Sequence, residues 1–158
     1  MKFHKASAAF FLAATLAGCV ASAKRPEMTS LQIQAIQLKE YDSTKEIVFP
    51  SVISVFQDIG YIISNADLET GIITAESAAE NNPAMAVFLG VSVVKQTKVT
   101  AFVEQIGSTT RVRLNFVEIE KSSSGYGQND RKDMPILDTK IYQNAFNKIG
   151  DAIFIRSS

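Results

Sequence analysis

The chain has one cysteine and one histidine, and both lie within its first 19 residues. His4 lies near the start, and Cys19 follows an apolar stretch. We expect residues 1–18 to be removed as an export signal, for reasons given below, so that the mature chain contains no histidine. Disulfides, thiolate nucleophiles, serine–histidine–aspartate triads and metal sites built from histidine or cysteine all need side chains that such a chain lacks. We therefore predict that the protein is not an enzyme and has no cofactor and no metal site.

Two weaker patterns could still carry chemistry. Ser92–Lys95 (SVVK) has the S-x-x-K form, in which a lysine one helical turn after a serine activates it in penicillin-binding enzymes. The partner motifs S-D-N and K-T-G are absent, so we expect no catalysis here. The carboxylate pairs Asp67/Glu69 and Glu118/Glu120 would suit glycoside hydrolysis only if they faced each other across a cleft. Acids two residues apart on a strand usually form its solvated side, and we favour that interpretation.

Other residues could contact a partner instead. Pro83–Val94 (PAMAVFLGVSVV), at 12 residues the most apolar stretch of the mature chain, is too short to span a bilayer. It is either a core element, which we favour, or a segment lying on a membrane or a partner, in which case Val87, Phe88 and Leu89 are candidate contact residues. Tyr126 stands between two glycines in Ser122–Arg131, which we interpret as a flexible loop. An exposed loop aromatic is a candidate contact residue, although folding back over the sheet is an equal alternative.

Four basic residues fall on segments with strand patterns and could share one face: Lys98, Arg111, Arg113 and Lys121. Such a face would suit acidic lipid head groups or an acidic partner. Because Glu104 and Glu118 are nearby in the sequence, we favour a solvated face of mixed charge.

The N-terminus has the layout of a secretory signal. Lys2 and Lys5 form a positive region, Phe10–Ala17 (FFLAATLA) is apolar, and small residues follow. The apolar run is too short to cross a hydrocarbon core of about 30 Å comfortably. An ordinary signal cut after Ala23 is the alternative to the lipoprotein signal described next.

The residues Leu16, Ala17, Gly18 and Cys19 resemble the bacterial lipobox at all four positions. That resemblance implies that the Cys19 thiol carries a diacylglyceryl group, that the signal is cut before it, and that its new amine is acylated. A single acyl chain holds a protein weakly, and such a cysteine supplies more than one. Because Val20 and not aspartate follows, similarity to proteobacterial sorting rules implies the periplasmic face of the outer membrane.

Composition limits the rest of the chain. Removal of Lys2 and Lys5 with the signal leaves 14 basic and 16 acidic residues, a net charge of −2. No basic excess of the kind found in nucleic-acid-binding proteins is visible, so we expect no nucleic-acid partner. The full sequence is 46% hydrophobic, which is enough for a folded domain. We predict a tether at 19–30 and a single domain at 31–156.

Hydrophobic periodicity predicts the elements of that domain. Leu31–Leu38 alternates briefly, which predicts a strand with a bulge near Ala35. Ser43–Glu46 has capping-box form, and the apolar stripe after it predicts a helix ending at Gly60, kinked at Pro50 or beginning there. We expect strands at 61–64, 72–75, 98–106 and 111–119, the last two joined by a short hairpin loop. Asp138 should cap a final helix, whose buried stripe is predicted to be Tyr142, Ala145, Phe146, Ile149, Ala152 and Ile153.

The order β-α-β-β-β-β-α predicts an α+β fold, with two amphipathic helices packed on one face of a single antiparallel sheet. The segments 56–63 (FQDIGYII), 68–75 (LETGIITA) and 141–146 (IYQNAF) resemble a group of small uncharacterised proteobacterial lipoproteins. The order of elements is similar to that of the helix-grip domains of BamC, a lipoprotein of the outer-membrane barrel assembly machine. Pro50 departs from the pattern expected of the first helix. The resemblance implies no catalytic residue.

These observations together predict a non-enzymatic, lipid-anchored periplasmic domain that binds an envelope protein or assists envelope assembly. A small-ligand or lipid carrier is the alternative, and it would need an apolar cavity of several hundred cubic ångströms. A hydrolase that works through carboxylates ranks third. The residues predict neither the identity of the partner nor the oligomeric state.

Overall fold

The computed structural model of the chain describes residues 28–81, 91–125 and 127–158. Within these residues the helices and strands follow one another in the order α1 (Ser30–Gln37), β1 (Leu38–Tyr41), α2 (Lys45–Asp58), β2 (Tyr61–Asp67), β3 (Ile72–Ser77), β4 (Glu80–Asn81), β5 (Val91–Ile106), β6 (Thr109–Ser124), β7 (Asn129–Pro135) and α4 (Thr139–Ser157).

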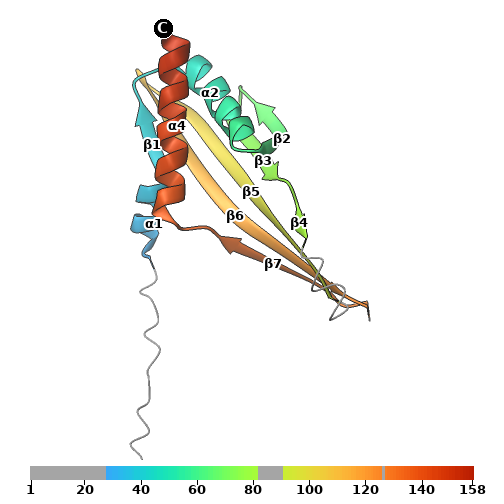
Figure 1. Cartoon of the computed structure of the whole chain (residues 1–158). Coiled ribbons are helices and arrows are strands. Elements are labelled where there is room, and N and C mark those ends of the chain that lie inside the picture. The colour runs from blue at the N-terminus through green and yellow to red at the C-terminus, as the bar shows by residue number, and fades with distance from the viewer. Residues whose placement is uncertain (1–27, 82–90, 126) are drawn as a thin grey trace, which may run out of the picture.

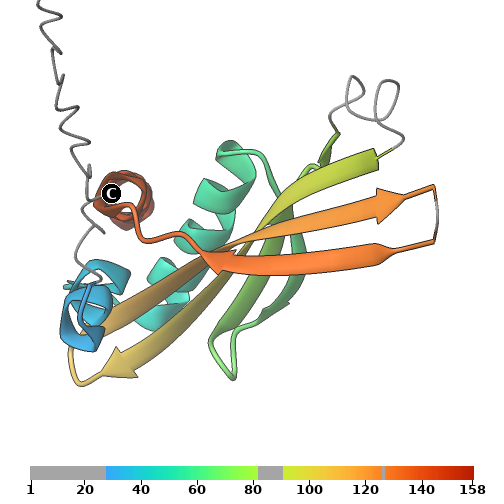
Figure 2. The ribbon, with the colours of Figure 1, turned by 90° about the horizontal axis from the view of Figure 1, so that it is seen from below.

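The strands form a single sheet in which every described pairing is antiparallel. Its order is β1-β6-β5-β3-β2, and β4 and β7 pair with β5 and β6 at the far end of the long hairpin. Figures 1 and 2 show α2 and α4 on the same face of this sheet. The expectation of an α+β fold with one antiparallel sheet is therefore confirmed, although the described residues contain three helices and not two.

The core lies between that face and the two helices. Val99 of β5 is opposite Phe116 of β6, and Ala101 is opposite Leu114, and all four side chains are buried. The alternate positions of these strands lie on the other face, which no described helix covers (Figure 2). Every residue predicted for the α4 stripe lies in the core cluster or packs against it, as predicted from the 3.6-residue period.

The long hairpin extends well beyond the helices. β5 and β6 have 16 residues each and span about 50 Å at roughly 3.3 Å per residue. With 19 and 14 residues, α4 and α2 are only about 28 and 21 Å long. The helices therefore cover one half of the hairpin. The other half, Val91–Thr97 paired with Glu118–Ser124, projects with β4 and β7 at its sides, and we call it the arm (Figure 1).

The strand predicted at Leu31–Leu38 is wrong, because the chain forms α1 there. Thr29 and Gln32 make a capping box: the Thr29 amide donates to Gln32 Oε1 over 2.8 Å, and the Gln32 amide donates to Thr29 Oγ1 over 3.3 Å. Ile36 packs against the core, whereas Leu31 is 77% exposed. The alternation of Leu31 and Ile33 resembles a strand pattern. The partly buried residues Ile33 and Ile36, however, lie three positions apart, which is a helical spacing.

The predicted flexible loop at Ser122–Arg131 is also wrong in most of its length. β6 continues to Ser124, and β7 begins at Asn129 and pairs back along it. Gly127, with a φ of 81°, supplies the left-handed backbone of the turn between them. These strands lie in the arm, where β7 is mostly exposed and the end of β6 consists of serines, so they lack the apolar alternation that identifies a strand.

The caps agree with the sequence in part. Asp138 accepts a hydrogen bond from the Lys140 amide over 2.9 Å and caps α4, as predicted. For α2 the N-cap is Thr44 and not Ser43, and its side chain makes no capping bond. The Lys45 amide instead donates to Gln105 Oε1 over 2.7 Å. α2 begins before Pro50 and continues through it, so the alternative start at Pro50 is wrong.

Candidate interaction surface

Several predicted site residues lie outside the described residues. They are the lipobox residues Leu16, Ala17, Gly18 and Cys19, and the candidate contact residues Val87, Phe88, Leu89 and Tyr126. Their roles in lipid attachment and partner contact stay predictions.

The S-x-x-K pattern does not form a serine–lysine pair. Ser92 and Lys95 lie three residues apart on β5, and positions three apart on a strand point to opposite faces. Lys95 Nζ instead lies 3.4 Å from Glu118 Oε1 and 3.2 Å from Glu120 Oε2 on β6. The carboxylates of Glu120 and Glu118 raise the pKa of Lys95, so the ammonium stays charged and is a poor base.

The two carboxylate pairs have structural partners as well. Asp67 Oδ1 accepts the Glu69 amide over 2.9 Å and the Thr70 amide over 3.4 Å, in the turn between β2 and β3. The Thr70 hydroxyl and these amides lower the pKa of Asp67. Its carboxylate is therefore a turn-forming acceptor. The parts of the chain that the structure describes hold no group of three histidine, cysteine or acidic residues that could bind a metal.

The four basic residues that were predicted to share a face lie on the uncovered face of the sheet: Lys98, Arg111, Arg113 and Lys121. Glu104 lies on that face too, whereas Lys95 and Glu118 lie on the face that carries the helices. Lys98 Nζ is 3.7 Å from Glu76 Oε1, and Arg111 Nη2 is 2.8 Å from Glu40 Oε1. Arg113 is opposite Phe102 on the same face. This surface has mixed charge, as predicted, and an acidic partner would meet acids as well as bases on it.

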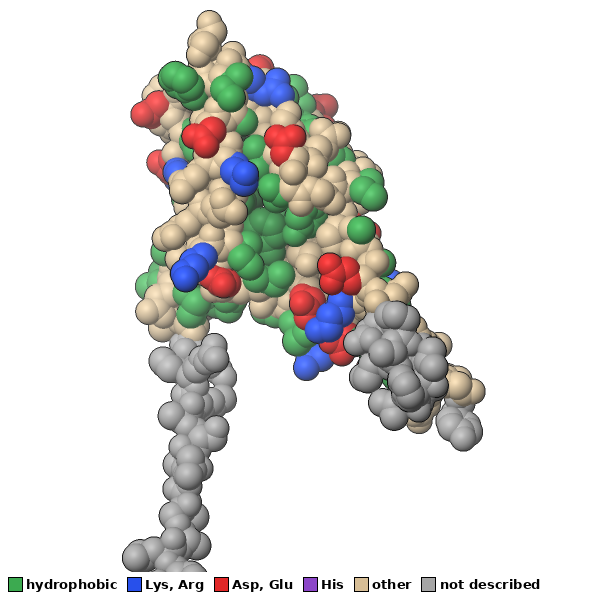
Figure 3. Space-filling view, viewed as in Figure 1, with side chains coloured by type: hydrophobic (Ala, Val, Ile, Leu, Met, Phe, Trp, Pro, Cys, Tyr) green, Lys and Arg blue, Asp and Glu red, His purple; other side chains and the backbone are tan. Residues whose placement is uncertain are grey.

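The face that carries the helices has an apolar hollow beside α4. We use this name for a depression of about 140 Å³ whose lining is mainly apolar: Ile59, Tyr61, Phe116, Ile141 and Ala145. Asn144 and Lys148 complete the lining. Figure 3 shows apolar side chains gathered in the middle of this face. Ile141 is 41% exposed, and partial burial raises the pKa of the half-buried Tyr61. A neutral phenol and aliphatic side chains suit an apolar group of a partner.

The hollow exists because α2 stops early. Gly60, with a φ of 88°, ends the helix, and the chain turns there into β2. The aromatic floor of the sheet continues past that point. The Tyr61 and Phe116 rings lie 6.4 Å apart edge to face, and the Phe116 and Tyr142 rings lie 5.2 Å apart. The Tyr142 hydroxyl donates to the Ile136 carbonyl over 2.9 Å, which fixes the approach to α4.

A charged cluster borders the hollow on the arm. Phe116, Glu118 and Glu120 alternate along β6, so they share one face of the sheet. Lys95 bridges the two acids from β5. A partner that lies along this face would meet apolar atoms first and ion pairs next, which is the usual arrangement of an interface with an apolar centre and a polar rim.

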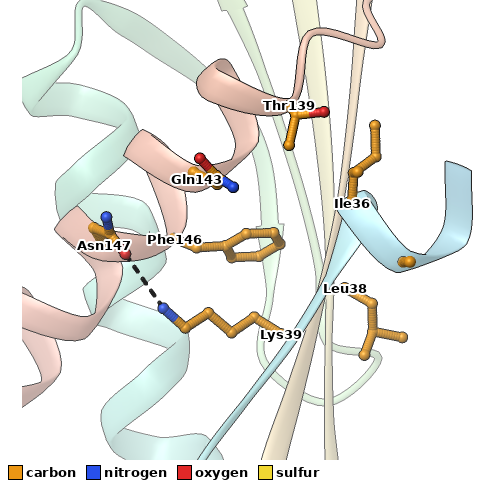
Figure 4. A pocket seen from close by; sticks show the side chains of 8 residues that line it. Ile36, Leu38, Lys39, Thr139, Gln143, Phe146 and Asn147 are labelled. Atoms are coloured by element: carbon orange, nitrogen blue, oxygen red, sulfur yellow. Dashed lines mark hydrogen bonds between the residues drawn. The ribbon is translucent and has the colours of Figure 1, made fainter. Parts of the chain in front are cut away.

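A second groove lies between α1 and α4 and holds about 220 Å³. Figure 4 shows Phe146 pointing from α4 into the groove toward Ile36 and Leu38, with Lys39 below it. Lys39 Nζ is 3.4 Å from Asn147 Oδ1 and 5.6 Å from the centre of the Tyr41 ring. The Lys39 ammonium therefore has partners within the domain and is a weak anchor for an anion.

A third hollow lies on the arm, holds about 340 Å³ and is lined mainly by polar residues such as Ser122, Ser123 and Arg131. In the part of the chain that the structure covers, no helix combines the length and the apolar character needed to cross a membrane.

Comparison of the sequence with protein-family models and with curated proteins found no match.

Sequence reasoning did not identify the apolar hollow. Ile141 was a usable signal, because it stands beside the buried stripe of α4 and not within it, and an isoleucine there must face solvent or a partner. Tyr61 gave no signal, since its half-burial depends on where α2 ends.

Proposed function

We propose that the chain is a lipid-anchored, non-enzymatic binding or assembly lipoprotein of the bacterial envelope, held at the periplasmic face of the outer membrane. Its contact with an envelope protein partner is the apolar hollow beside α4. The arrangement of one long helix against an antiparallel sheet is helix-grip-like. The single observation that carries the binding site is the exposed apolar hollow next to an ion-paired arm.

Packing supports binding at a surface over a buried ligand site. The helix-facing side chains of β3, β5 and β6 in the core cluster have exposures of 0–2%, as do Val48, Val52 and Phe56 of α2. The apolar hollow, the α1–α4 groove and the hollow on the arm hold about 140–340 Å³, at or below the lower end of the range for small-molecule sites. These features give the carrier hypothesis less support than the binding hypothesis.

The experiment is an affinity pull-down of the lipidated protein from cross-linked membranes, with partners identified by mass spectrometry. The test variant is Ile141→Glu, and Phe102→Glu is its matched control. The two residues are 41% and 42% exposed, but Phe102 lies on the uncovered face of the sheet. We expect Ile141→Glu to lose the partner and Phe102→Glu to retain it. Equal recovery with both variants would contradict the assignment of the hollow.

Complementation of a deletion strain tests the alternative of catalysis. Complementation of a deletion strain with Glu118→Gln or Glu120→Gln should restore the resistance of the envelope to detergent. If such a variant were exported and folded but showed the full defect of the deletion strain, the binding hypothesis would fail and carboxylate catalysis would take its place.

A further inference from the structure

We propose that the first turn of α1 rests on the lipid bilayer, so that Leu31 inserts between the head groups. This inference depends on the proposed lipid anchor at Cys19. It adds a second membrane contact, made by the folded domain itself. The occupant of the surface is thus a lipid bilayer and not a protein.

The length of the tether carries the argument. Ten peptide units join Cys19 to Thr29, the N-cap of α1, and even fully extended they reach only about 35 Å. α1 lies at the foot of α4, and the C-terminus lies at the opposite end of that helix (Figure 1). An anchored cysteine therefore keeps the start of α1 within about 35 Å of the bilayer, and this short tether raises the effective concentration of lipid around α1.

The side chains of α1 suit that position. Leu31 is 77% exposed, and Gln34 and Ala35, three and four residues later, are exposed on the same side of the helix. The helix SLQIQAIQ contains no charged residue, so no ion has to lose its hydration when this side approaches lipid.

Three backbone amides at the start of α1 are bonded within the chain. An uncapped helix start exposes amide groups that need water. Here the Thr29 and Gln32 amides are bonded to side chains of the capping box, and the Ile33 amide donates to the Thr29 carbonyl over 3.0 Å. Ile36 holds the inner side of α1 against the core. The domain thus presents Leu31 on a fixed helix and not on a loose chain.

The test uses tryptophan fluorescence, because the chain contains no tryptophan. Leu31→Trp is the probe, and Phe154→Trp is the matched control. Leu31 and Phe154 are 77% and 75% exposed, but Phe154 lies near the C-terminal end of α4. Each full-length lipidated variant is placed in vesicles of phosphatidylethanolamine and phosphatidylglycerol, with or without bromine on the acyl chains near the head group.

Interfacial side chains sit about 5–10 Å into the head-group boundary, within reach of bromine there, so we expect Trp at position 31 to lose about half of its emission or more. The emission of Trp at position 154 should be unchanged. If the protein floats with the vesicles but bromine quenches neither variant, or both equally, the seating is refuted while the anchor stands. If the protein does not float, the anchor is refuted, and the seating with it.

Discussion

Replacing Phe146 with alanine removes an aromatic ring from the boundary between the core and the α1–α4 groove. Phe146 is 4% exposed and belongs to the core cluster, yet its ring also points into the groove of about 220 Å³. Phe56 of α2 is 0% exposed and is buried on all sides. Comparing Phe146→Ala with Phe56→Ala therefore separates two losses of unfolding free energy, the loss from removing a ring and the loss from leaving a closed void.

The expected magnitudes follow from that difference. Truncating a buried phenylalanine to alanine costs about 3–5 kcal/mol, and the cost rises with the volume of the void that remains. Water can enter the space left by Phe146 from the groove, so we expect about 3 kcal/mol for Phe146→Ala. We expect about 5 kcal/mol for Phe56→Ala. A domain of this size has only about 5–15 kcal/mol of stability in total.

The assay is urea and thermal unfolding of the chain from residue 20 onward, produced without the signal and followed by circular dichroism. The melting temperature should fall by about 10 °C for Phe146→Ala and further for Phe56→Ala. An unchanged melting temperature in Phe146→Ala would mean that the inner face of α4 is wrongly assigned. A larger loss for Phe146→Ala than for Phe56→Ala would refute the role given to the groove.

Three further predictions concern a turn, a phenol and the anchor. A Cβ on Gly71, whose φ is 77°, would overlap the Val103 carbonyl oxygen. Gly71→Ala should therefore lower the free energy of unfolding by about 2–4 kcal/mol, measured in urea. Gly60→Ala is the control, because its Cβ meets open space, and it should lower that free energy by only about 1 kcal/mol. Burial raises the pKa of Tyr41 above its unfolded value of about 10. The contribution of the neutral Tyr41 phenol to the free energy of unfolding is therefore complete below pH 10 and is lost as the pH rises. The stability of the domain should decline above pH 10, and it should decline less steeply in Tyr41→Phe. An equal slope in that variant would contradict the assignment. Replacing Cys19 with serine should abolish palmitate labelling and leave the signal uncut by the lipoprotein peptidase, and labelling that persists would refute the lipobox.

The sequence predicted the parts of the fold that border the core. The stripe of α4 is buried except for the partly buried Ala152, and Leu114 and Phe116 of β6 are buried as well. A single apolar interior imposes its period on both a helix and a strand. The hairpin at Gly107 was also predicted at its correct place.

The arm and α1 escaped prediction for a common physical reason. Val91–Thr97 and Ser122–Ser124 extend β5 and β6 past the helices, where most residues are only partly buried on either face and no strict apolar alternation is required. α1 is a short helix with only one partly buried side, and its capping residues Thr29 and Gln32 are the local signal that was available. The apolar hollow depends on where α2 ends relative to the sheet, which is a tertiary relation that no local pattern records.

Photo-cross-linking in living cells tests the central claim most directly. The lipidated protein carries benzoyl-phenylalanine at the position of Ile141 in the apolar hollow, or at Phe102 on the uncovered face as the matched control. We predict one discrete adduct with an envelope protein from position 141, and none from position 102. Adducts of equal yield from both positions, or an adduct from position 102 alone, would contradict a binding role for the hollow.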